Sequence, residues 1–592
     1  MQDQIVKQLR QLFKSSLKRI LLVVPPEATE EDFNIALALN RRYWAYPPYG
    51  AAILARSLKN SGYAAAIVDL NYEILSHVFE KPHEFSYEIW KKALGKSLES
   101  FRPDLIGISC MFTMGHMNMK RVAEEVKRLC DLPVAAGGVH PTNAPEAVLR
   151  DCPDIDFIGL YECDQSLPAL FDVVNGKQPE TELSQVAMLI GGDFVSFNER
   201  TPPKLDEILP PDYCELAIGK YDGLGQVGTY RFMRENRTAA SCLAVRGCRA
   251  KCSFCSVRSF NGSGVRTREV VLVVDEVERL VHDYGIKHIT WLDDDLLFNE
   301  MRATALFNEI IRRKMNLTWD ASNGVIAAAI TPGLLHAMVE SGCIGLNIGI
   351  ESGSPKILQE VHKPGTVDSF RKAKYLLAAY PYLFIKGFLM MGFPGETLGQ
   401  MKETVNLALE LGFDWYPLQI LNPLPSKEIF GSLTQDCGSV IANPGTGGWM
   451  AGIFQSLNLR RREENEKANA RKFFDRLQGK DLDLVPSKED LADLWFLMDY
   501  KINYEPILDM ENPVKLENKR KILRDICDRI SHANALGNLF LSLTERKLRS
   551  FAEADRRMAL AKQFLDESDY WQKRFAVFGL YRHLSGCEAK AV

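Results

Sequence analysis

Three cysteines in one short segment have the spacing of metal ligands. Residues 246–257 read RGCRAKCSFCSV, which places Cys248, Cys252 and Cys255 in a CxxxCxxC pattern with an aromatic residue, Phe254, before the last cysteine. Three thiolates can bind three irons of a cubane [4Fe-4S] cluster and leave the fourth iron without a protein ligand. An iron with an open position can bind a substrate or a cofactor, so the pattern predicts a reactive centre.

Zinc is the alternative for the same cysteines. Structural zinc needs four tetrahedral ligands and commonly uses paired CxxC elements. The sequence has no second CxxC or CxxH, so a zinc site would need Cys242 or a distant histidine as its fourth ligand. The spacing favours the cluster and leaves zinc open.

The cysteine segment follows the first of six predicted strands. Strand-like runs separated by helical stretches occur over residues 236–430, in AASCLAV, HITWLDD, LTWDAS, IGLNIGI, FIKGFLMMG and WYPLQIL. Six strand–helix units predict a partial (β/α)6 TIM-like barrel. Chemistry in such barrels gathers at the carboxyl ends of the strands, which is where the cysteines fall.

A second α/β region precedes the barrel. Residues 18–176 alternate helix-length stretches with the aliphatic runs RILLVV, AAAIVD, DLIGIS, LPVAAGG and IDFIGL. This alternation predicts a Rossmann-like, doubly wound parallel sheet. Its candidate ligand site lies in the loops after Val24, Ser109, Gly138 and Leu160. The first loop reads PPEATEEDF and lacks GxGxxG, so a NAD-binding domain is disfavoured.

The remaining segments are predicted from composition and periodicity. Residues 1–17 resemble a polar N-terminal helix, and the proline-containing residues 177–235 are predicted to be a linker. Residues 431–592 have helical periodicity without a compelling strand, which predicts an all-helical C-terminal domain. The fold class is therefore α/β with a helical C-terminal addition.

Composition excludes several functional classes. The formal charge is −4, from 72 Lys and Arg against 76 Asp and Glu, so no basic excess favours nucleic acid as a partner. No targeting or transmembrane segment is evident. Thirteen cysteines make an odd number, which disfavours a disulfide framework and favours reduced thiols in the cytoplasm.

The chain resembles the B12-binding-domain (cobalamin-dependent) radical S-adenosylmethionine (SAM) proteins over roughly residues 18–430. Besides the cysteine pattern, the resemblance rests on YPPYGAAILARSLKNSGY, GGVHPTNAPE, RTREVVLVVDEVERL, WLDDDLLF, IGIESGSPKIL and MMGFPGET, in the family's order. It implies that the Rossmann-like domain binds cobalamin, and that the barrel binds the cluster through Cys248, Cys252 and Cys255 together with SAM.

The resemblance also implies residues that contact SAM. Phe254 resembles the residue that contacts the adenine, and Glu351 resembles an acid after the fourth barrel strand that contacts the ribose or amino-acid end. The remaining implied contacts are Asp293, Asp294, Gly392 and Gly395. The alternatives left open are a salt-bridged loop acid for Glu351, a solvated turn for the two aspartates and a simple turn for the two glycines.

For cobalamin, the clearest match is the loop GGVHPT, whose glycines permit close backbone approach. The signature DxHxxG is absent, so we expect no histidine as the lower axial cobalt ligand and a hydrogen-bonding or structural role for His140. Where the family commonly reads GEGE, this chain reads YECD and retains Glu162. The implied contacts are Ser109, Thr113, Gly137, Gly138, His140, Thr142 and Glu162.

The expected activity is methylation of an unactivated carbon by way of a 5'-deoxyadenosyl radical and methylcobalamin. Tyr43, Trp44 and Tyr46 either line the substrate cavity or belong to a core. The expected partners are a reducing donor such as flavodoxin or ferredoxin, and a small-molecule, lipid-like, tetrapyrrole or peptide substrate. Radical cyclisation, oxidation or ring contraction without methyl transfer, and a non-catalytic cobalamin- or metal-binding regulator, are the alternatives.

Overall fold

The computed structural model describes residues 2–13, 16–200, 202–214, 216–234, 237–421 and 481–584. The chain forms two compact units. The first contains the described residues up to 229 together with 237–323, and the second contains 230–234, 324–421 and 481–584. The predicted boundary at residue 430 lies outside the described residues. No described helix is long and apolar enough to cross a membrane.

The first sheet has seven strands in the order β2-β1-β3-β4-β5-β6-β7. The first five in sequence are parallel, as predicted, and the last two are antiparallel. Their bounds are β1 Arg19–Val24, β2 Ala64–Asp69, β3 Leu105–Ser109, β4 Val134–Gly137, β5 Phe157–Gly159, β6 Val186–Ile190 and β7 Asp193–Phe197. The sheet thus continues past residue 176 into the segment predicted as a linker.

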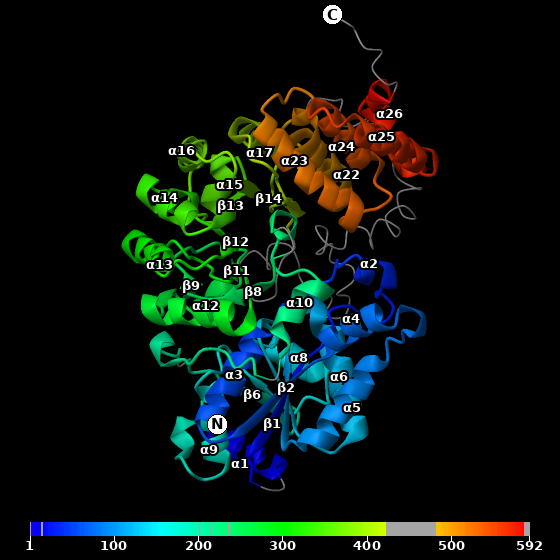
Figure 1. Ribbon diagram of the computed structural model, residues 1–592. Helices are drawn as coiled ribbons and strands as arrows, with labels where there is room; N and C mark the ends of the chain where they lie inside the picture. Colours follow the sequence, from blue (N-terminus) through cyan, green and yellow to red (C-terminus); the bar gives the residue numbers. More distant parts are fainter. Residues whose placement is uncertain are drawn as a thin grey trace, which may run out of the picture. The chain divides into compact units, whose positions relative to one another are not determined.

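Helices cover both faces of this sheet (Figure 1). Alternate residues of β1 enter different cores: Leu21 and Val23 pack with Trp90 of α5, whereas Ile20 and Leu22 pack with Leu58 of α3. Burial on both faces explains why the run RILLVV is continuously apolar. The helices are α1 Gln2–Leu12, α2 Ile35–Leu39, α3 Tyr49–Asn60, α4 Leu70–Glu80, α5 Ile89–Phe101, α6 His116–Leu129, α7 Val139–Asn143, α8 Pro145–Asp151, α9 Ser166–Val174 and α10 Ile218–Leu224.

The second sheet has the six predicted barrel strands, in the order β15-β14-β13-β12-β11-β8. The strand pairs β8–β11, β11–β12, β13–β14 and β14–β15 are parallel. The strands are β8 Ala239–Cys242, β11 His288–Trp291, β12 Thr318–Val325, β13 Cys343–Glu351, β14 Phe384–Met391 and β15 Leu418–Ile420. Between them lie α12 Val270–Tyr284, α13 Glu300–Arg312, α14 Pro332–Glu340, α15 Pro355–Glu360, α16 Val367–Leu377 and α17 Leu398–Leu411. The predicted α/β class and partial barrel are confirmed.

A short antiparallel hairpin follows β8. It consists of β9 Val245–Cys248 and β10 Gly264–Thr267, with α11 Val257–Asn261 in its connection. Gly247 has a φ of +88°, and a Cβ there would lie 2.5 Å from the Gly264 carbonyl oxygen. Glycine at this position therefore lets the two strands approach directly before the first cysteine.

The described C-terminal part is helical, as predicted. Its helices are α22 Lys488–Asp499, α23 Pro513–Asp525, α24 Ala535–Lys547, α25 Phe551–Asp566 and α26 Asp569–Val577, with π-helical segments Tyr500–Tyr504 and Ile526–Ile530. Tyr504 and Phe540 pack with Trp415 in one core. The buried Asn503 amide accepts a hydrogen bond from the Tyr416 backbone N–H at 2.8 Å and donates to its carbonyl at 2.9 Å. These bonds fix the helices to the chain entering β15.

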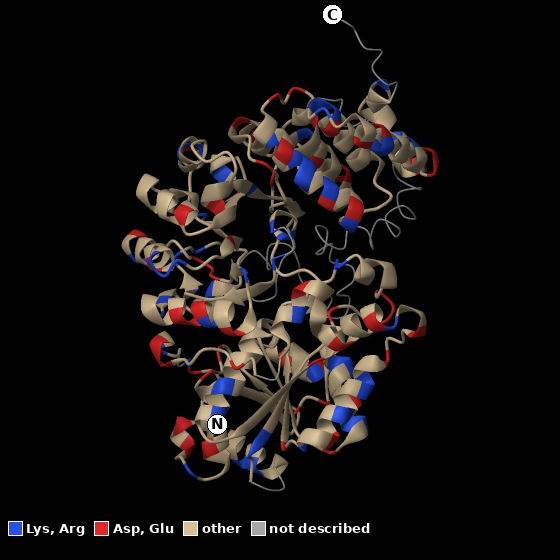
Figure 2. Ribbon diagram, viewed as in Figure 1, with Lys and Arg blue, Asp and Glu red and all other residues tan. Residues whose placement is uncertain are grey.

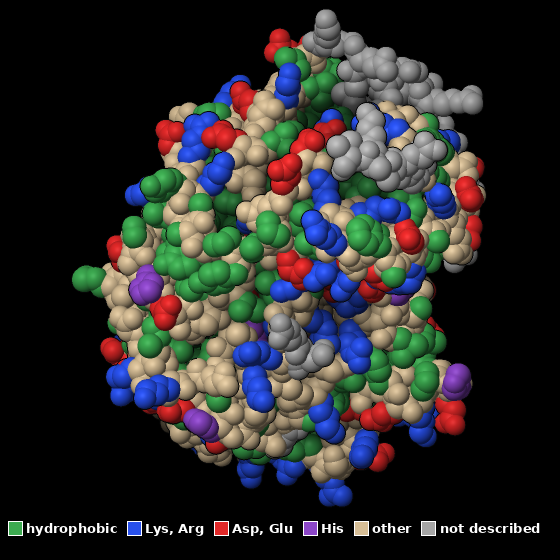
Figure 3. All heavy atoms as spheres, turned by 45° about the horizontal axis from the view of Figure 1, so that its top comes forward, with side chains coloured by type: hydrophobic (Ala, Val, Ile, Leu, Met, Phe, Trp, Pro, Cys, Tyr) green, Lys and Arg blue, Asp and Glu red, His purple; other side chains and the backbone are tan. Residues whose placement is uncertain are grey.

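Charged residues of both signs are interspersed on the helices, while the strands of the first sheet carry few (Figure 2). The space-filling view likewise shows acidic, basic and apolar side chains intermingled on the visible face (Figure 3). This distribution follows from nearly balanced numbers of acidic and basic residues.

Candidate functional site

The three predicted cluster ligands lie in the β9–β10 hairpin. Cys248 is the last residue of β9, and Cys252 and Cys255 lie in the turn before α11. The Cys255 backbone N–H donates to the Cys252 carbonyl at 3.2 Å, and the Ala250 N–H donates to Cys248 Sγ at 3.4 Å. All three cysteines are half-buried. The N–H bond to Cys248 Sγ favours the thiolate that iron requires, whereas burial outweighs it and raises the Cys248 pKa to about 11.

The spacing of the sulfur atoms fits a cluster better than a single ion. Ligands of one zinc ion lie within about 4 Å of one another, because zinc–sulfur bonds are about 2.3 Å long. Among the described residues, the group of three side chains close enough together for one metal ion does not include these cysteines. Cys242, the alternative zinc ligand, is fully buried and donates its thiol to Glu276 Oε1 at 3.5 Å. The cysteines therefore fit ligation of separate irons.

Asp295, which the sequence analysis did not select, holds this loop. Its buried carboxylate accepts the Arg249 backbone N–H at 3.3 Å and pairs with the Arg249 guanidinium at 3.0 Å. Cys248 Sγ lies 3.9 Å from the same carboxylate. Asp295 is the third aspartate of WLDDD. Its position next to the predicted site residues Asp293 and Asp294 is the sequence feature that could have identified it as part of the site.

The other two aspartates of WLDDD accept hydrogen bonds from residues in and beside the cysteine hairpin. Asp293 Oδ1 accepts the backbone N–H groups of Ala244 and Val245 at 3.0 and 2.7 Å, between β8 and β9. Burial raises the Asp293 pKa to about 7. Asp294 accepts the Asn261 side-chain amide at 3.0 Å, and burial raises its pKa to about 6. The geometry gives both a role in shaping the cysteine hairpin, and their contact with SAM stays a prediction.

The predicted SAM residues of the second unit lie at strand ends. Glu351, the last residue of β13, pairs with Lys363 Nζ at 2.7 Å and has a φ of +67°. Gly392 and Gly395 also have positive φ values, +80° and +71°. Glu396 Oε2 accepts the Gly392 N–H at 2.6 Å, whereas its buried Oε1 has no hydrogen-bond partner among the described residues. That orphaned oxygen fits a polar ligand beside the GFPGE loop.

The predicted cobalamin residues lie at the carboxyl edge of the first sheet. Ser109 is exposed and Thr113 is half-buried. Gly138 has a φ of +112°, and a Cβ there would lie 2.4 Å from the Cys110 carbonyl oxygen. Glycine is therefore required here by the chain's own packing. Thr142 Oγ1 accepts the Tyr161 N–H at 2.9 Å, which joins the loops after β4 and β5.

Two large apolar side chains are exposed at this edge. Met111 is 60% and Phe112 57% exposed, directly after β3. Exposed apolar surface at the ligand edge of a doubly wound sheet is typical of a binding site. The apolar face of a corrin ring, such as that of cobalamin, fits this surface.

His140, another predicted cobalamin residue, is paired with a second histidine. It is buried, and its Nε2 lies 2.9 Å from His116 Nδ1. Burial lowers the His140 pKa to about 3, so the ring is neutral. This geometry fits the hydrogen-bonding role expected for His140.

The loop after β5 is tied to the cysteine hairpin by buried ion pairs, which we call the β5–β9 clamp. Arg246, two residues before Cys248, donates to Glu162 at 2.7 Å and to both Asp164 carboxylate oxygens at 2.9 Å. Arg266 of β10 also pairs with Glu162. Glu162, predicted as a cobalamin contact, therefore faces the hairpin arginines. The clamp holds residues 248–255, the candidate cluster loop, at the candidate cobalamin edge.

A hydrogen bond beside the clamp joins another loop of the same edge. Ser259 of α11 donates to the side-chain carbonyl of Asn143, the last residue of α7, at 2.9 Å. Both loops after β4 and β5 thus contact the cysteine-bearing segment.

The aromatic residues Tyr43, Trp44 and Tyr46 have structural contacts. Tyr43 is buried and its hydroxyl accepts the Asn34 N–H at 2.9 Å. Trp44 stacks on Tyr46, with ring centroids 5.5 Å apart, and the Tyr46 hydroxyl accepts the Gly228 N–H at 2.9 Å. These contacts favour the core alternative for Tyr43.

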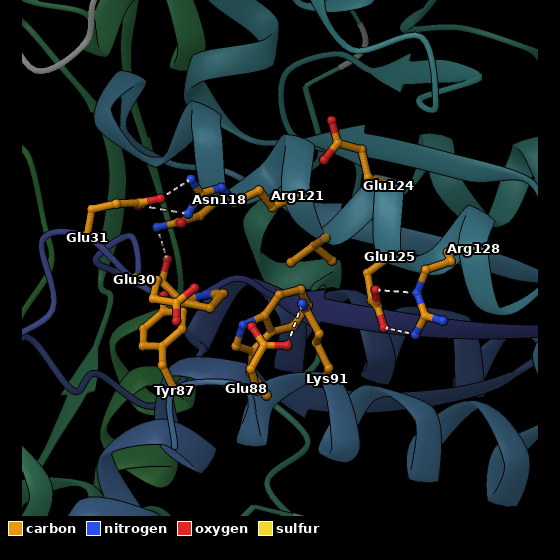
Figure 4. A pocket seen from close by; sticks show the side chains of 13 residues that line it. Glu30, Glu31, Tyr87, Glu88, Lys91, Asn118, Arg121, Glu124, Glu125 and Arg128 are labelled. Carbon is orange, nitrogen blue, oxygen red and sulfur yellow. Dashed lines mark hydrogen bonds and ion pairs between the residues drawn. The ribbon is translucent and has the colours of Figure 1, made fainter. Parts of the chain in front are cut away.

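A surface hollow of about 360 Å³ lies between α5, α6 and the loop after β1 (Figure 4). Its charged groups largely pair with one another: Arg121 with Glu31, and Arg128 with Glu125, at 2.7 and 2.6 Å. The lining of the hollow contains no cysteine, and most of its charged groups are paired, so we assign it no catalytic role.

Two family models match the chain. The radical SAM superfamily matches residues 243–408 and the B12 binding domain matches residues 37–171. The chain is 29% identical over 427 residues to the uncharacterized methyltransferase PH0819 of Pyrococcus horikoshii, covering 70% of this chain and 82% of that protein. It is 23% identical to the anaerobic magnesium-protoporphyrin IX monomethyl ester cyclase of Cereibacter sphaeroides, covering 66% of this chain and 60% of that protein.

A solved structure has a similar fold. It is the radical SAM methyltransferase TsrM of Kitasatospora setae, with cobalamin and a [4Fe-4S] cluster bound. The TM-score is 0.56 at 18% identity, over 70% of this chain and 77% of that chain.

Proposed function

Because this chain belongs to the cobalamin-dependent radical SAM family, we propose that it is a C-methyltransferase that methylates an unactivated carbon. The family's cofactors, a [4Fe-4S] cluster, SAM and cobalamin, are those of this enzyme. The observation that carries the proposal is a match to the B12-binding domain followed by a match to the radical SAM domain whose three cysteines lie in one hairpin. Methyltransferases among the relatives favour methyl transfer.

When bound, the cluster and SAM supply one-electron radical chemistry, and cobalamin supplies a transferable methyl group. Cys248, Cys252 and Cys255 would bind three irons. Asp295 orients the loop through Arg249, and Arg246 holds it against Glu162 and Asp164. The exposed Met111 and Phe112 would cover apolar cofactor surface. Fixed positions of this kind reduce the orientational freedom that a reaction between bound groups must otherwise lose.

The SAM and cobalamin contacts are part of the proposal. In the second unit, Glu351 and the GFPGE loop would contact SAM, and Glu396 Oε1 offers an acceptor there. SAM contacts of Phe254, Asp293 and Asp294 in the first unit stay predictions. For cobalamin, the loops after β3 and β4 would supply Ser109, Thr113 and backbone groups near Gly137 and Gly138. Cytoplasmic location, a flavodoxin- or ferredoxin-type electron donor and the substrate class also stay predictions.

The test is SAM cleavage by the anaerobically reconstituted protein with cobalamin, compared between wild type and Cys252→Ala. We expect wild type to bind about one cobalamin, carry a reducible cluster and release 5'-deoxyadenosine, and the variant to release none. The exposed Cys214 supplies the control, because Cys214→Ala should retain both cluster and cleavage. An intact cluster that cleaves no SAM would overturn the enzyme proposal in favour of a binding protein.

A cyclase is the second candidate, favoured by similarity to the anaerobic magnesium-protoporphyrin IX monomethyl ester cyclase. Product mass separates the two: methyl transfer adds one methylene to the substrate and consumes a second SAM, whereas cyclisation adds no carbon.

A further inference from the structure

Three potential metal ligands meet away from the cysteine hairpin. His116 begins α6, Asp151 ends α8, and Cys152 follows it. His116 and Cys152 are 0% and 1% exposed, whereas the Asp151 side chain is 42% exposed. No role in the proposed methyl transfer uses these three groups.

Their geometry matches a single ion. His116 Nε2 lies 2.9 Å from Asp151 Oδ2, and Cys152 Sγ lies 3.8 and 3.9 Å from those two atoms. The three ligand atoms form a triangle, and the point inside it that is equally far from all three lies about 2.1 Å from each atom. Zinc binds nitrogen, oxygen and sulfur at about 2.0–2.3 Å. An ion at that point, or slightly above it, reaches every ligand with little movement of the chain.

The surroundings orient the histidine for this role. Metal-bound histidines usually donate their second ring N–H to a neighbouring acceptor, which fixes the tautomer. His116 Nδ1 lies 2.9 Å from His140 Nε2. A His116 tautomer that carries its proton on Nδ1 and donates it to His140 Nε2 has its Nε2 lone pair available to a metal ion beside Asp151 and Cys152.

We propose that His116 Nε2, Asp151 Oδ2 and Cys152 Sγ bind one zinc ion. Water completes the coordination, because Asp151 opens the site to solvent. On binding, the Cys152 thiol releases its proton to solvent and no electron is transferred. The ion joins the start of α6 to the end of α8, the helices that follow β3 and β4. Lys120 Nζ, 3.1 Å from the same Asp151 oxygen, competes with it.

The experiment measures zinc retained by the full-length protein, reconstituted with its cluster, after incubation with zinc chloride and gel filtration. We expect about one zinc per chain in wild type, and about tenfold less in Cys152→Ser and Asp151→Asn. Lys120→Met should bind zinc more tightly. Cys130→Ser is the matched control, because Cys130 is a half-buried cysteine of the same domain, and it should retain zinc.

Cobalt(II) gives a second readout that does not depend on activity. In the C248A/C252A/C255A chain without cobalamin, cobalt(II) should give a thiolate charge-transfer band that Cys152→Ser removes and Cys130→Ser keeps. Zinc content equal in Cys152→Ser and wild type, or no zinc retained by wild type, would overturn the proposal. The Asp151 side chain is partly exposed, so Asp151→Asn should fold. Its zinc content therefore tests the proposal even if Cys152→Ser, which changes a buried residue, fails to fold. Loss of SAM cleavage does not enter either measurement, so the two proposals fail separately.

Discussion

At the residue scale, burial decides the charge state of the aspartates beside the cysteine hairpin. Asp293 is 2% exposed, and its carboxylate is held by two backbone N–H groups. Desolvation outweighs these bonds and raises its pKa above the ordinary value near 4. The sequence WLDDD identified the carboxylates, but not that each bonds to a different part of the chain.

Asp293→Asn tests this charge state. A raised pKa means that the folded state binds a proton more tightly than the unfolded state, so the contribution of Asp293 to stability is lost as the pH rises from about 4 to about 7. Between pH 5 and 8 we expect wild type to lose about 2 kcal/mol of unfolding free energy relative to Asp293→Asn. The asparagine carbonyl keeps both backbone bonds.

The measurement is urea unfolding of the metal-free protein at both pH values. A difference between wild type and Asp293→Asn that does not change with pH contradicts the raised pKa. Asp131→Asn, at an exposed aspartate outside the hairpin, supplies the control.

At the scale of elements, the β5–β9 clamp connects a loop of the cobalamin domain to the strand that carries Cys248. Arg246, Glu162 and Asp164 have side chains exposed by only 13%, 5% and 7%. Removing one member of a buried ion pair leaves an uncompensated charge, which costs about 3–5 kcal/mol. The clamp therefore matters more for the geometry of the cluster loop than surface ion pairs do.

We expect Arg246→Met to destabilise the first unit by about 3 kcal/mol, and Arg246→Met/Asp164→Asn to cost less than the sum of the single variants. The exposed pair of Arg150 and Glu146 is the control, because Arg150→Met should cost under about 0.5 kcal/mol. Denaturant unfolding gives these values. Equal costs at Arg246 and Arg150 would contradict the clamp.

The clamp also predicts a catalytic signature distinct from stability. If it positions the cluster loop, Arg246→Lys, which keeps one donor, should release more 5'-deoxyadenosine per methylated product than wild type, with cluster content unchanged. A purely structural role leaves that ratio constant.

At the scale of the whole molecule, ligand binding and folding are linked. A ligand that binds only the folded state at a hundred times its dissociation constant adds about 2.7 kcal/mol of stability. Cobalamin should therefore raise the melting temperature of the first unit's transition by several degrees, and Met111→Asp/Phe112→Asp should reduce this shift without lowering the melting temperature of the cobalamin-free protein. Differential scanning calorimetry measures both. An unchanged shift would place cobalamin elsewhere.

The sequence by itself determined the fold class and predicted the cluster ligands. Continuous apolar runs such as RILLVV require a sheet buried on both faces, and CxxxCxxC places its ligands in one loop whatever surrounds them. Only tertiary structure decided the partners of Glu162, Asp293 and His140. Glu162 and Arg246 are 84 residues apart, and His116 meets Asp151 through the packing of two helices. Such contacts depend on which strand ends share an edge, and periodicity within a segment does not encode that arrangement.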